Sequence, residues 1–182
     1  ELVAKGKAEP ISYASAGSGG TTHLSGVLFG QKTGAQMLHV PYKGSGPALQ
    51  ALLGNQVMVT FTALFTAKPF VESGQLRMLA LTSEKRSSLF PTVPTLDEAG
   101  VKGVNVHVFF ALLAPAGIPD AVRDKLSSLA QAVLNKPNLR KQRESRGLDI
   151  PSDNTPKLLG EKMRRETQEW AAVVRASGAS LD

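Results

Sequence analysis

The stretch YASAGSGGTTHL at residues 13–24 joins an apolar run to an amphipathic one. The apolar run, residues 11–15, is short and bounded by turn formers, which predicts a strand. Residues 21–32 place their leucines and their valine on one face, which predicts a helix. The glycine-rich segment between them would therefore lead from the end of a strand directly into the start of a helix.

The same pattern continues through the first hundred residues, with glycine or proline at nearly every junction. Short apolar runs that alternate with amphipathic segments are typical of βα units on a mainly parallel sheet. We expect further strands at 37–40, 57–61 and 76–81, and helices at 47–53, 66–73 and 96–99. The predicted fold class is therefore α/β.

The remainder of the chain has a different character. Residues 104–114 form a longer apolar segment that we expect to be extended, and the segments after it, 120–134, 137–146 and 155–176, read as helices. These helices should need a sheet that this chain does not supply. We therefore divide the chain into residues 1–103 and residues 104–182.

Composition excludes several classes of protein. The 182 residues, 42% of them hydrophobic, are enough for one substantial core. The absence of cysteine excludes a disulfide framework, a thiol nucleophile and cysteine-ligated zinc. No apolar run approaches the roughly 20 residues that span a bilayer, and the first residues lack the layout of a signal peptide. We expect a soluble chain that carries no export signal of its own.

The net charge of +6 raises the question of nucleic-acid binding. The basic residues are spread along the chain, and the densest run, RKQR at 140–143, lies among acidic neighbours on a predicted helix. This distribution favours a solvated helix face, and a basic nucleic-acid surface at residues 140–146 is the weaker alternative. We expect no nucleic-acid partner.

The glycine-rich segment has the features of an anion-binding site. It carries several hydroxyls and backbone N–H groups at a helix N-terminus, where amides lack intrahelical partners and the helix dipole favours negative charge. Glycine also permits a ligand to approach the backbone closely. The alternative is that the segment is only a tight connection.

Two further strand exits should lie along the same edge of the sheet, where ligands of open parallel sheets bind. Residues 40–47, VPYKGSGP, supply an aromatic ring, a cation and two glycines, and Thr62 adds a hydroxyl at the third exit. Lys43 is able to neutralise an acid, although an exposed lysine is the safer interpretation. For Tyr42, the sequence supports two interpretations equally, a ring that lines a pocket and a ring that covers the core.

Enzyme and metal motifs are mostly absent. There is no G-x-S-x-G elbow, and the glycine segment lacks the third glycine of a dinucleotide fingerprint. His23, His39 and His107 are far apart and have no carboxylate at helical spacing, so neither a metal nor a cofactor is expected. For His23, a local structural hydrogen bond is favoured over contact with an anion. The alternative function is a hydrolase or transferase that uses Ser18 with His23, although no acid is placed to orient that histidine.

Six segments together resemble the extracytoplasmic solute receptors of tripartite tricarboxylate transporters, the Bug receptors. They are YASAGSGGTTHL at 13–24, VPYKG at 40–44, LGNQV at 53–57, GQLR at 74–77, PTVPT at 91–95 and LAPAGIP at 113–119. Each segment is weak alone, but their order and spacing resemble the family along the whole chain.

The resemblance implies a non-catalytic, periplasmic-binding-protein-like (type II, Venus-flytrap) receptor that captures a small carboxylate in the bacterial periplasm for membrane transporter subunits. Residues 1–103 would form the second lobe, and residues 104–182 the hinge strand and the C-terminal helices of the first lobe. The N-terminal part of the family's chain would be lacking, which predicts a homodimer or exchanged segments because apolar surface is left bare.

The resemblance also assigns candidate ligand-binding residues. The carboxylate loop corresponds to Ser15, Gly17, Ser18, Gly19 and Thr21, the second wall to Tyr42, Lys43 and Gly44, and a commonly aromatic hinge position to Phe109. Relatives often carry aspartates in the third strand region, where this chain has Met58 and Thr62. A hydroxyl at Thr62 favours a purely anionic or neutral-bodied acid over a ligand with an amino group.

Overall fold

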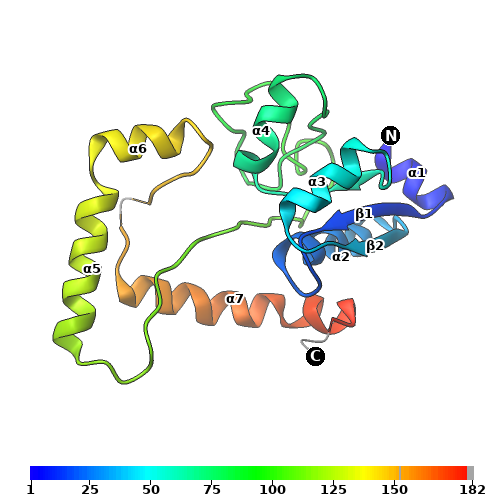
Figure 1. Cartoon of the computed structure of the whole chain (residues 1–182). Coiled ribbons are helices and arrows are strands. Elements are labelled where there is room, and N and C mark those ends of the chain that lie inside the picture. Colours follow the sequence, from blue (N-terminus) through cyan, green and yellow to red (C-terminus); the bar gives the residue numbers. More distant parts are fainter. Residues whose placement is uncertain (152, 180–182) are drawn as a thin grey trace. The chain divides into compact units, whose positions relative to one another are not determined.

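The computed structural model describes residues 1–151 and 153–179 and divides the chain into two compact units (Figure 1). The first unit contains Glu1–Val108 and the segment that starts at Ala171, and the second contains Phe109–Trp170. The sequence-based division after residue 103 separates two receptor lobes rather than these compact units. It stays a prediction.

The first unit is built on a parallel sheet with the strand order β2-β1-β3. The strands are β1 Ile11–Ser15, β2 Met37–Pro41 and β3 Val59–Thr60. The central strand β1 is almost fully buried because both of its edges are paired and both of its faces are covered. The predicted α/β class with a mainly parallel sheet is confirmed.

Helices cover the two faces of this sheet. On one face, α3 (Ser45–Leu53) packs Ala48 and Ala51 against Ala14 of β1. Neighbouring side chains of a strand point to opposite faces, so Tyr13 faces α2 (Thr21–Thr33). The tight contact there depends on Gly26, where a Cβ atom would lie 2.2 Å from the Tyr13 ring.

Two other helices complete the N-terminal part. The helix α1 (Leu2–Ala8) was not predicted, and α4 (Leu64–Glu72) begins two residues before the expected 66–73. The predicted short helix at 96–99 is only a turn.

The predicted strand at 76–81 is wrong. Its first amide, of Leu76, donates to the Phe70 carbonyl at the end of α4. Its last residue, Leu81, forms a single parallel bridge with Thr95. Both ends of the run are therefore taken by neighbours other than the sheet, and no ladder forms between them.

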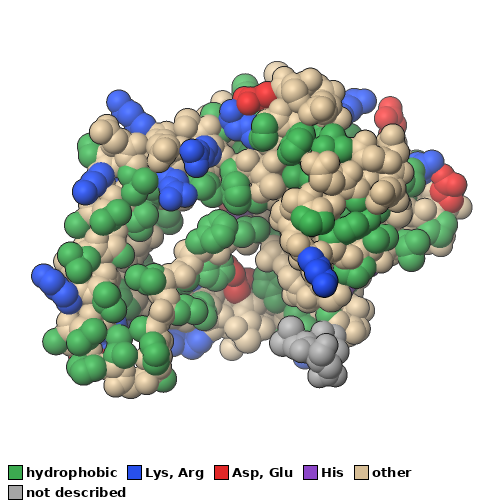
Figure 2. All heavy atoms as spheres, in the orientation of Figure 1, with side chains coloured by type: hydrophobic (Ala, Val, Ile, Leu, Met, Phe, Trp, Pro, Cys, Tyr) green, Lys and Arg blue, Asp and Glu red, His purple; other side chains and the backbone are tan. Residues whose placement is uncertain are grey.

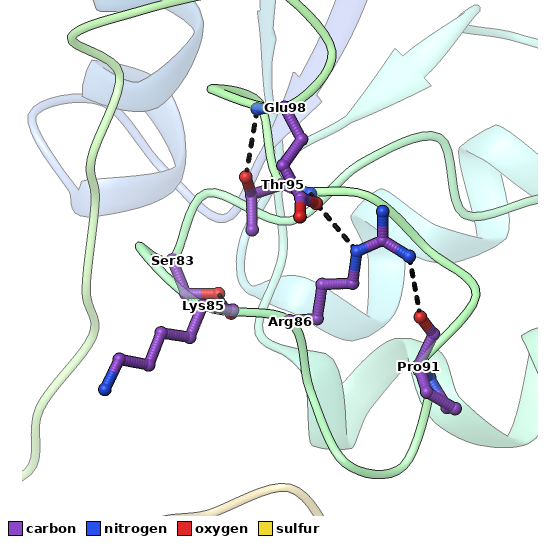
Figure 3. Close-up of polar contacts among 6 residues, drawn as sticks. All are labelled: Ser83, Lys85, Arg86, Pro91, Thr95 and Glu98. Carbon is purple, nitrogen blue, oxygen red and sulfur yellow. Dashed lines mark hydrogen bonds and ion pairs between the residues drawn. The ribbon is translucent and has the colours of Figure 1, made fainter.

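The segment that follows is held by polar contacts of Arg86, Thr95 and Glu98 (Figure 3). Arg86 donates to the Glu98 carboxylate at 2.7 Å and to the Pro91 carbonyl at 2.9 Å. Glu98 accepts from the Thr95 amide, and this hydrogen bond, followed by the one from Arg86, lowers the pKa of the Glu98 carboxyl. These contacts join positions up to 12 residues apart in a region whose described residues form one strand bridge.

Val104 and Val106 attach the end of this segment to the first unit, because both side chains are buried. Thr82 also donates its hydroxyl to the Val106 carbonyl at 2.8 Å. The first compact unit consequently extends to Val108. Residues 104–114 form no strand in the structure that is described.

The second unit contains α5 (Asp120–Leu134), α6 (Pro137–Glu144) and most of α7 (Pro156–Ser177), close to the predicted bounds. Its described residues contain no strand. Apolar side chains stay exposed on α5, and Figure 2 shows hydrophobic atoms on the visible surface of this unit.

Arg140 of the basic run donates to the Ile150 carbonyl, so it stabilises a turn. No helix among the described residues has the length and apolar character of a membrane span.

Candidate ligand-binding site at the carboxyl edge of the sheet

Three strands end at the same level. Ser15 pairs with Pro41 and Ala14 with Thr60, so the chain continues from this level into Ala16, Tyr42 and Phe61–Thr62. Hydrogen bonds join the first two exits, since Tyr42 N–H donates to the Ser15 carbonyl at 3.0 Å and Gly44 N–H to the Ala16 carbonyl at 3.1 Å. The predicted loops therefore meet at one edge of the sheet.

The glycine loop between β1 and α2 requires glycine at two positions. Gly17 has φ 144° and Gly19 has φ 74°, which are conformations that residues with a side chain rarely adopt. The loop ends at Gly20, the N-cap of α2. Glycine is therefore used here for the backbone path as well as for access.

Several donors of the glycine loop are already paired within the protein. The amides of Ala16, Gly17 and Gly19 donate to Thr22 Oγ1, Ser15 Oγ and His23 Nδ1 at 2.9, 3.2 and 3.1 Å. The Gly17 amide and the Ser15 hydroxyl are bonded to each other. The role of these two residues as ligand contacts, which the resemblance implies, stays a prediction.

The donors that remain unpaired define what the loop can bind. The hydroxyls of Ser18 and Thr21 and the amides of Ser18, Gly20, Thr21 and Thr22 have no hydrogen bond within the described part of the chain. They lie at the N-terminus of a helix of 13 residues, where the helix dipole attracts negative charge. An anion would find unpaired amides and hydroxyls together at this point.

The second loop supplies a glycine turn, an aromatic ring and an exposed cation. Gly44 has φ 106° and is the N-cap of α3. Tyr42 packs against the cluster of Ala14, Ala48, Ala51 and Val57, so its ring covers core. Lys43 is exposed and forms no ion pair with any described residue. Both side chains remain predicted contacts.

Thr62 at the third exit is an unusual residue. Its Oγ1 atom is buried and has no hydrogen-bond partner in the part of the chain that the structure describes. A buried hydroxyl without a partner costs roughly 1–3 kcal/mol. Such a group is commonly a ligand contact or a water site, and it lies at the carboxyl edge of the sheet.

The electrostatic setting favours an anion. Residues 10–71, which include all three strands and their exits, contain no Asp or Glu, whereas Lys32, Lys43 and Lys68 lie within the same stretch. A carboxylate ligand would therefore meet no like charge from this segment.

A pair of histidines behind the loop was missed by the sequence analysis. The rings of His23 and His39 stack with their centroids 3.8 Å apart, and His39 Nε2 lies 2.6 Å from Ser15 Oγ. His23 forms the local structural hydrogen bond that was favoured, with the Gly19 amide. Burial lowers the pKa of His23, and burial followed by the neighbouring His23 lowers the pKa of His39 to about 4.

The remaining predicted residue, Phe109, belongs to the second unit. Lys162 of the same unit places its Nζ atom 4.9 Å from the centre of the Phe109 ring. The described residues contain no cluster of three or more metal-ligating side chains.

Comparison with known proteins identifies relatives along the whole chain. A protein from Cupriavidus necator, the UPF0065 protein in gbd 5'region, is 41% identical over 142 residues, which are 77% of this chain and 43% of that protein. BugT of Bordetella pertussis is 35% identical over 182 residues, or 99% of this chain and 56% of the relative. The chain thus spans about half the length of these relatives.

Solved structures agree with this assignment. R. palustris Rpa4515 with adipate superposes with a TM-score of 0.89 at 31% identity, covering 98% of this chain and 60% of that one. The periplasmic binding protein BugD gives 0.84 at 32% identity with the same coverage. MatC of Rhodopseudomonas palustris with bound malate gives 0.81 at 28% identity, over 90% of this chain and 56% of that one. The predicted periplasmic-binding-protein-like fold is confirmed.

The family model described as tripartite tricarboxylate transporter family receptor matches residues 1–178. The chain therefore belongs to the tripartite tricarboxylate transporter receptor family, as its six motifs predicted.

Proposed function

We propose that this chain is part of a receptor that binds a small organic acid where the three strands of its sheet end. The main support is the set of unpaired donors at this edge, formed by the glycine loop and the buried Thr62 hydroxyl. Amides and hydroxyls can bind a carboxylate without a buried cation, and the surrounding stretch carries no acidic side chain.

Dicarboxylates are the ligand class that the comparisons support best. Two of the similar structures are described with adipate and with malate, which are both dicarboxylic acids. We extend this class to tricarboxylates and related organic acids. The hydroxyl of Thr62 carries no negative charge for a ligand ammonium group, so an acid without an amino group is favoured.

The wider role follows from family membership. We propose that the intact receptor acts in the bacterial periplasm, closes two lobes over its ligand and presents the closed form to membrane transporter subunits. Residues 1–103 would supply the second lobe, and residues 104–182 the hinge, with Phe109, and the helices of the first lobe.

Catalysis is not part of this proposal, because the family consists of substrate-binding receptors rather than enzymes. The alternative of a hydrolase or transferase requires Ser18 within hydrogen-bond reach of a base. His23 Nδ1 instead accepts the Gly19 amide, and Ser18 forms no hydrogen bond with any described residue. No contact among the residues that the structure describes favours this alternative.

The test is calorimetric titration of the 182-residue chain with adipate, malate and citrate, together with the variant Ser18→Asp. A carboxylate at position 18 would repel the ligand, so we expect the variant to lose at least tenfold in affinity. Ser88→Asp is the matched control, because Ser88 is exposed, forms no hydrogen bond in the described structure and lies outside the three exits.

Binding that survives Ser18→Asp, or that Ser88→Asp weakens equally, would overturn the assignment of the site to the glycine loop. Failure of the chain to bind any of the three acids would overturn the proposed ligand class.

A further inference from the structure

The stacked histidines His23 and His39 are buried or half-buried, and the proposed function gives them no part. They come from two elements, the first turn of α2 and the middle of β2. Each hydrogen bonds to a different part of the glycine loop, His23 to Gly19 and His39 to Ser15. The pair is therefore hydrogen-bonded to both ends of the loop.

The hydrogen bond to Gly19 determines the protonation of the His23 ring. His23 Nδ1 accepts the Gly19 amide, so this nitrogen carries a lone pair and the imidazole is neutral. Ser15 Oγ accepts the Gly17 amide and lies 2.6 Å from His39 Nε2, a contact in which either atom can donate, depending on the tautomer of His39. A proton added to His23 Nδ1 would put two donors face to face and break the bond to Gly19.

The surroundings offer no stabilisation for a charged imidazole. The titratable side chain that faces the pair from β1 is Tyr13, with its ring 5.1 Å from the His39 ring and 6.4 Å from the His23 ring. The Tyr13 hydroxyl is committed to the His23 carbonyl at 3.1 Å, and burial raises its pKa to about 12, so it stays neutral. No carboxylate bonds to either imidazole among the described residues, and each ring would repel a charge on the other.

We propose that His23 and His39 are positioning residues that hold the glycine loop in its binding conformation, and that protonation of His23 in acid breaks its hydrogen bond to Gly19 and releases the loop. The inference rests on the proposed function only where it concerns binding, because the effect on the loop is observable without ligand. Both histidines have a pKa below the ordinary value of 6.5, so the loop is held fully above that pH. It is released as the pH falls from 6.5 toward the lowered values.

The experiment follows the Gly19 amide and the histidine rings by NMR as the pH of the unliganded chain is lowered from 7.5. In the natural sequence we expect the Gly19 resonance to shift in one step, with the same midpoint as the His23 ring and below pH 6.5. Titration of His23 at 6.5 or above, or a Gly19 resonance that does not follow it, would overturn the proposal.

Two variants separate positioning from general stability. His23→Asn offers an amide oxygen in place of Nδ1 but does not titrate, so the Gly19 resonance should keep its neutral-pH position and lose the acid step. His39→Gln removes the group that protonates after His23, so the His23 step should persist below pH 6.5, because burial alone lowers the pKa of His23. His107→Asn is the control, because His107 is exposed and lies outside the pair, and the step should persist.

An acid step that persists in His23→Asn, or that disappears in His107→Asn, would contradict the role of the pair. Adipate titrations at pH 7 then test the binding site separately. If the Gly19 step behaves as expected and adipate does not bind, the loop mechanism stands and the proposed function fails.

Discussion

Replacing Gly26 by alanine tests how much the packing of α2 on β1 contributes to the stability of the first unit, whose strands carry the candidate site. Alanine is intrinsically better in a helix than glycine by about 1 kcal/mol. Against this gain, the added Cβ would lie 2.2, 2.4 and 2.8 Å from three atoms of the Tyr13 ring, where carbon atoms normally stay about 3.5–4.0 Å apart. The ring must therefore move by more than about 1 Å.

Movement of the Tyr13 ring is costly because the side chain is 1% exposed and is held from several sides. Its hydroxyl bonds to the His23 carbonyl, and its ring contacts His39 and Phe61. Overpacking of this kind costs about 1–3 kcal/mol. With the upper end of that range and the helical gain subtracted, Gly26→Ala should destabilise the first unit by about 2 kcal/mol.

The assay is native-state hydrogen exchange of β1 amides, because the chain has two compact units and a single unfolding curve would mix them. Gly160→Ala in α7 is the matched control. A Cβ there would meet only Arg164 Nη1 at 3.8 Å, so this variant should stabilise its helix by about 0.5–1 kcal/mol. Unchanged or increased protection of β1 in Gly26→Ala would refute the packing argument.

Two further predictions concern the buried hydroxyl of Thr62 and the exposed apolar residues of α5. Thr62→Val removes a buried hydroxyl that has no described partner, so we expect calorimetry to show weaker acid binding while thermal melting shows equal or higher stability; a loss of stability would mean that the hydroxyl has a structural role. The apolar residues Val122, Leu126, Leu129 and Val133 on α5 are exposed, and we expect a second copy of the chain to cover them. Analytical ultracentrifugation should then show a dimer that Leu126→Glu dissociates and Ser128→Glu, on exposed surface away from this set, does not. A natural chain that sediments only as a monomer would contradict this prediction.

Local sequence patterns predicted most of the elements correctly. Strands β1 to β3 and helices α2 to α7 arise from short-range periodicity and turn residues, which act within a few positions of the chain. Helix α1 was missed because Gly6 in its middle is a poor helix former. Its position is determined by a distant partner, since Gly6 packs against Ala35 and its carbonyl accepts the Gln36 amide.

The error at 76–81 has the same origin. Its apolar composition is suitable for a strand, but strand formation depends on an available neighbouring edge rather than on composition. Here the Leu76 amide donates to the Phe70 carbonyl, and Leu81 donates to the Pro94 carbonyl and accepts from the Leu96 amide instead.

For the site, the sequence by itself determined the βα loops, the glycine-rich connection, the acid-free stretch and, through six motifs, the family. Only the tertiary structure decided which loop donors are already paired. Ser15 and His39 are 24 residues apart, and Thr62 lies far along the chain from the glycine loop. Hydrogen-bond satisfaction and desolvation depend on what the folded chain brings together in space, and no local spacing along the sequence encodes those partners.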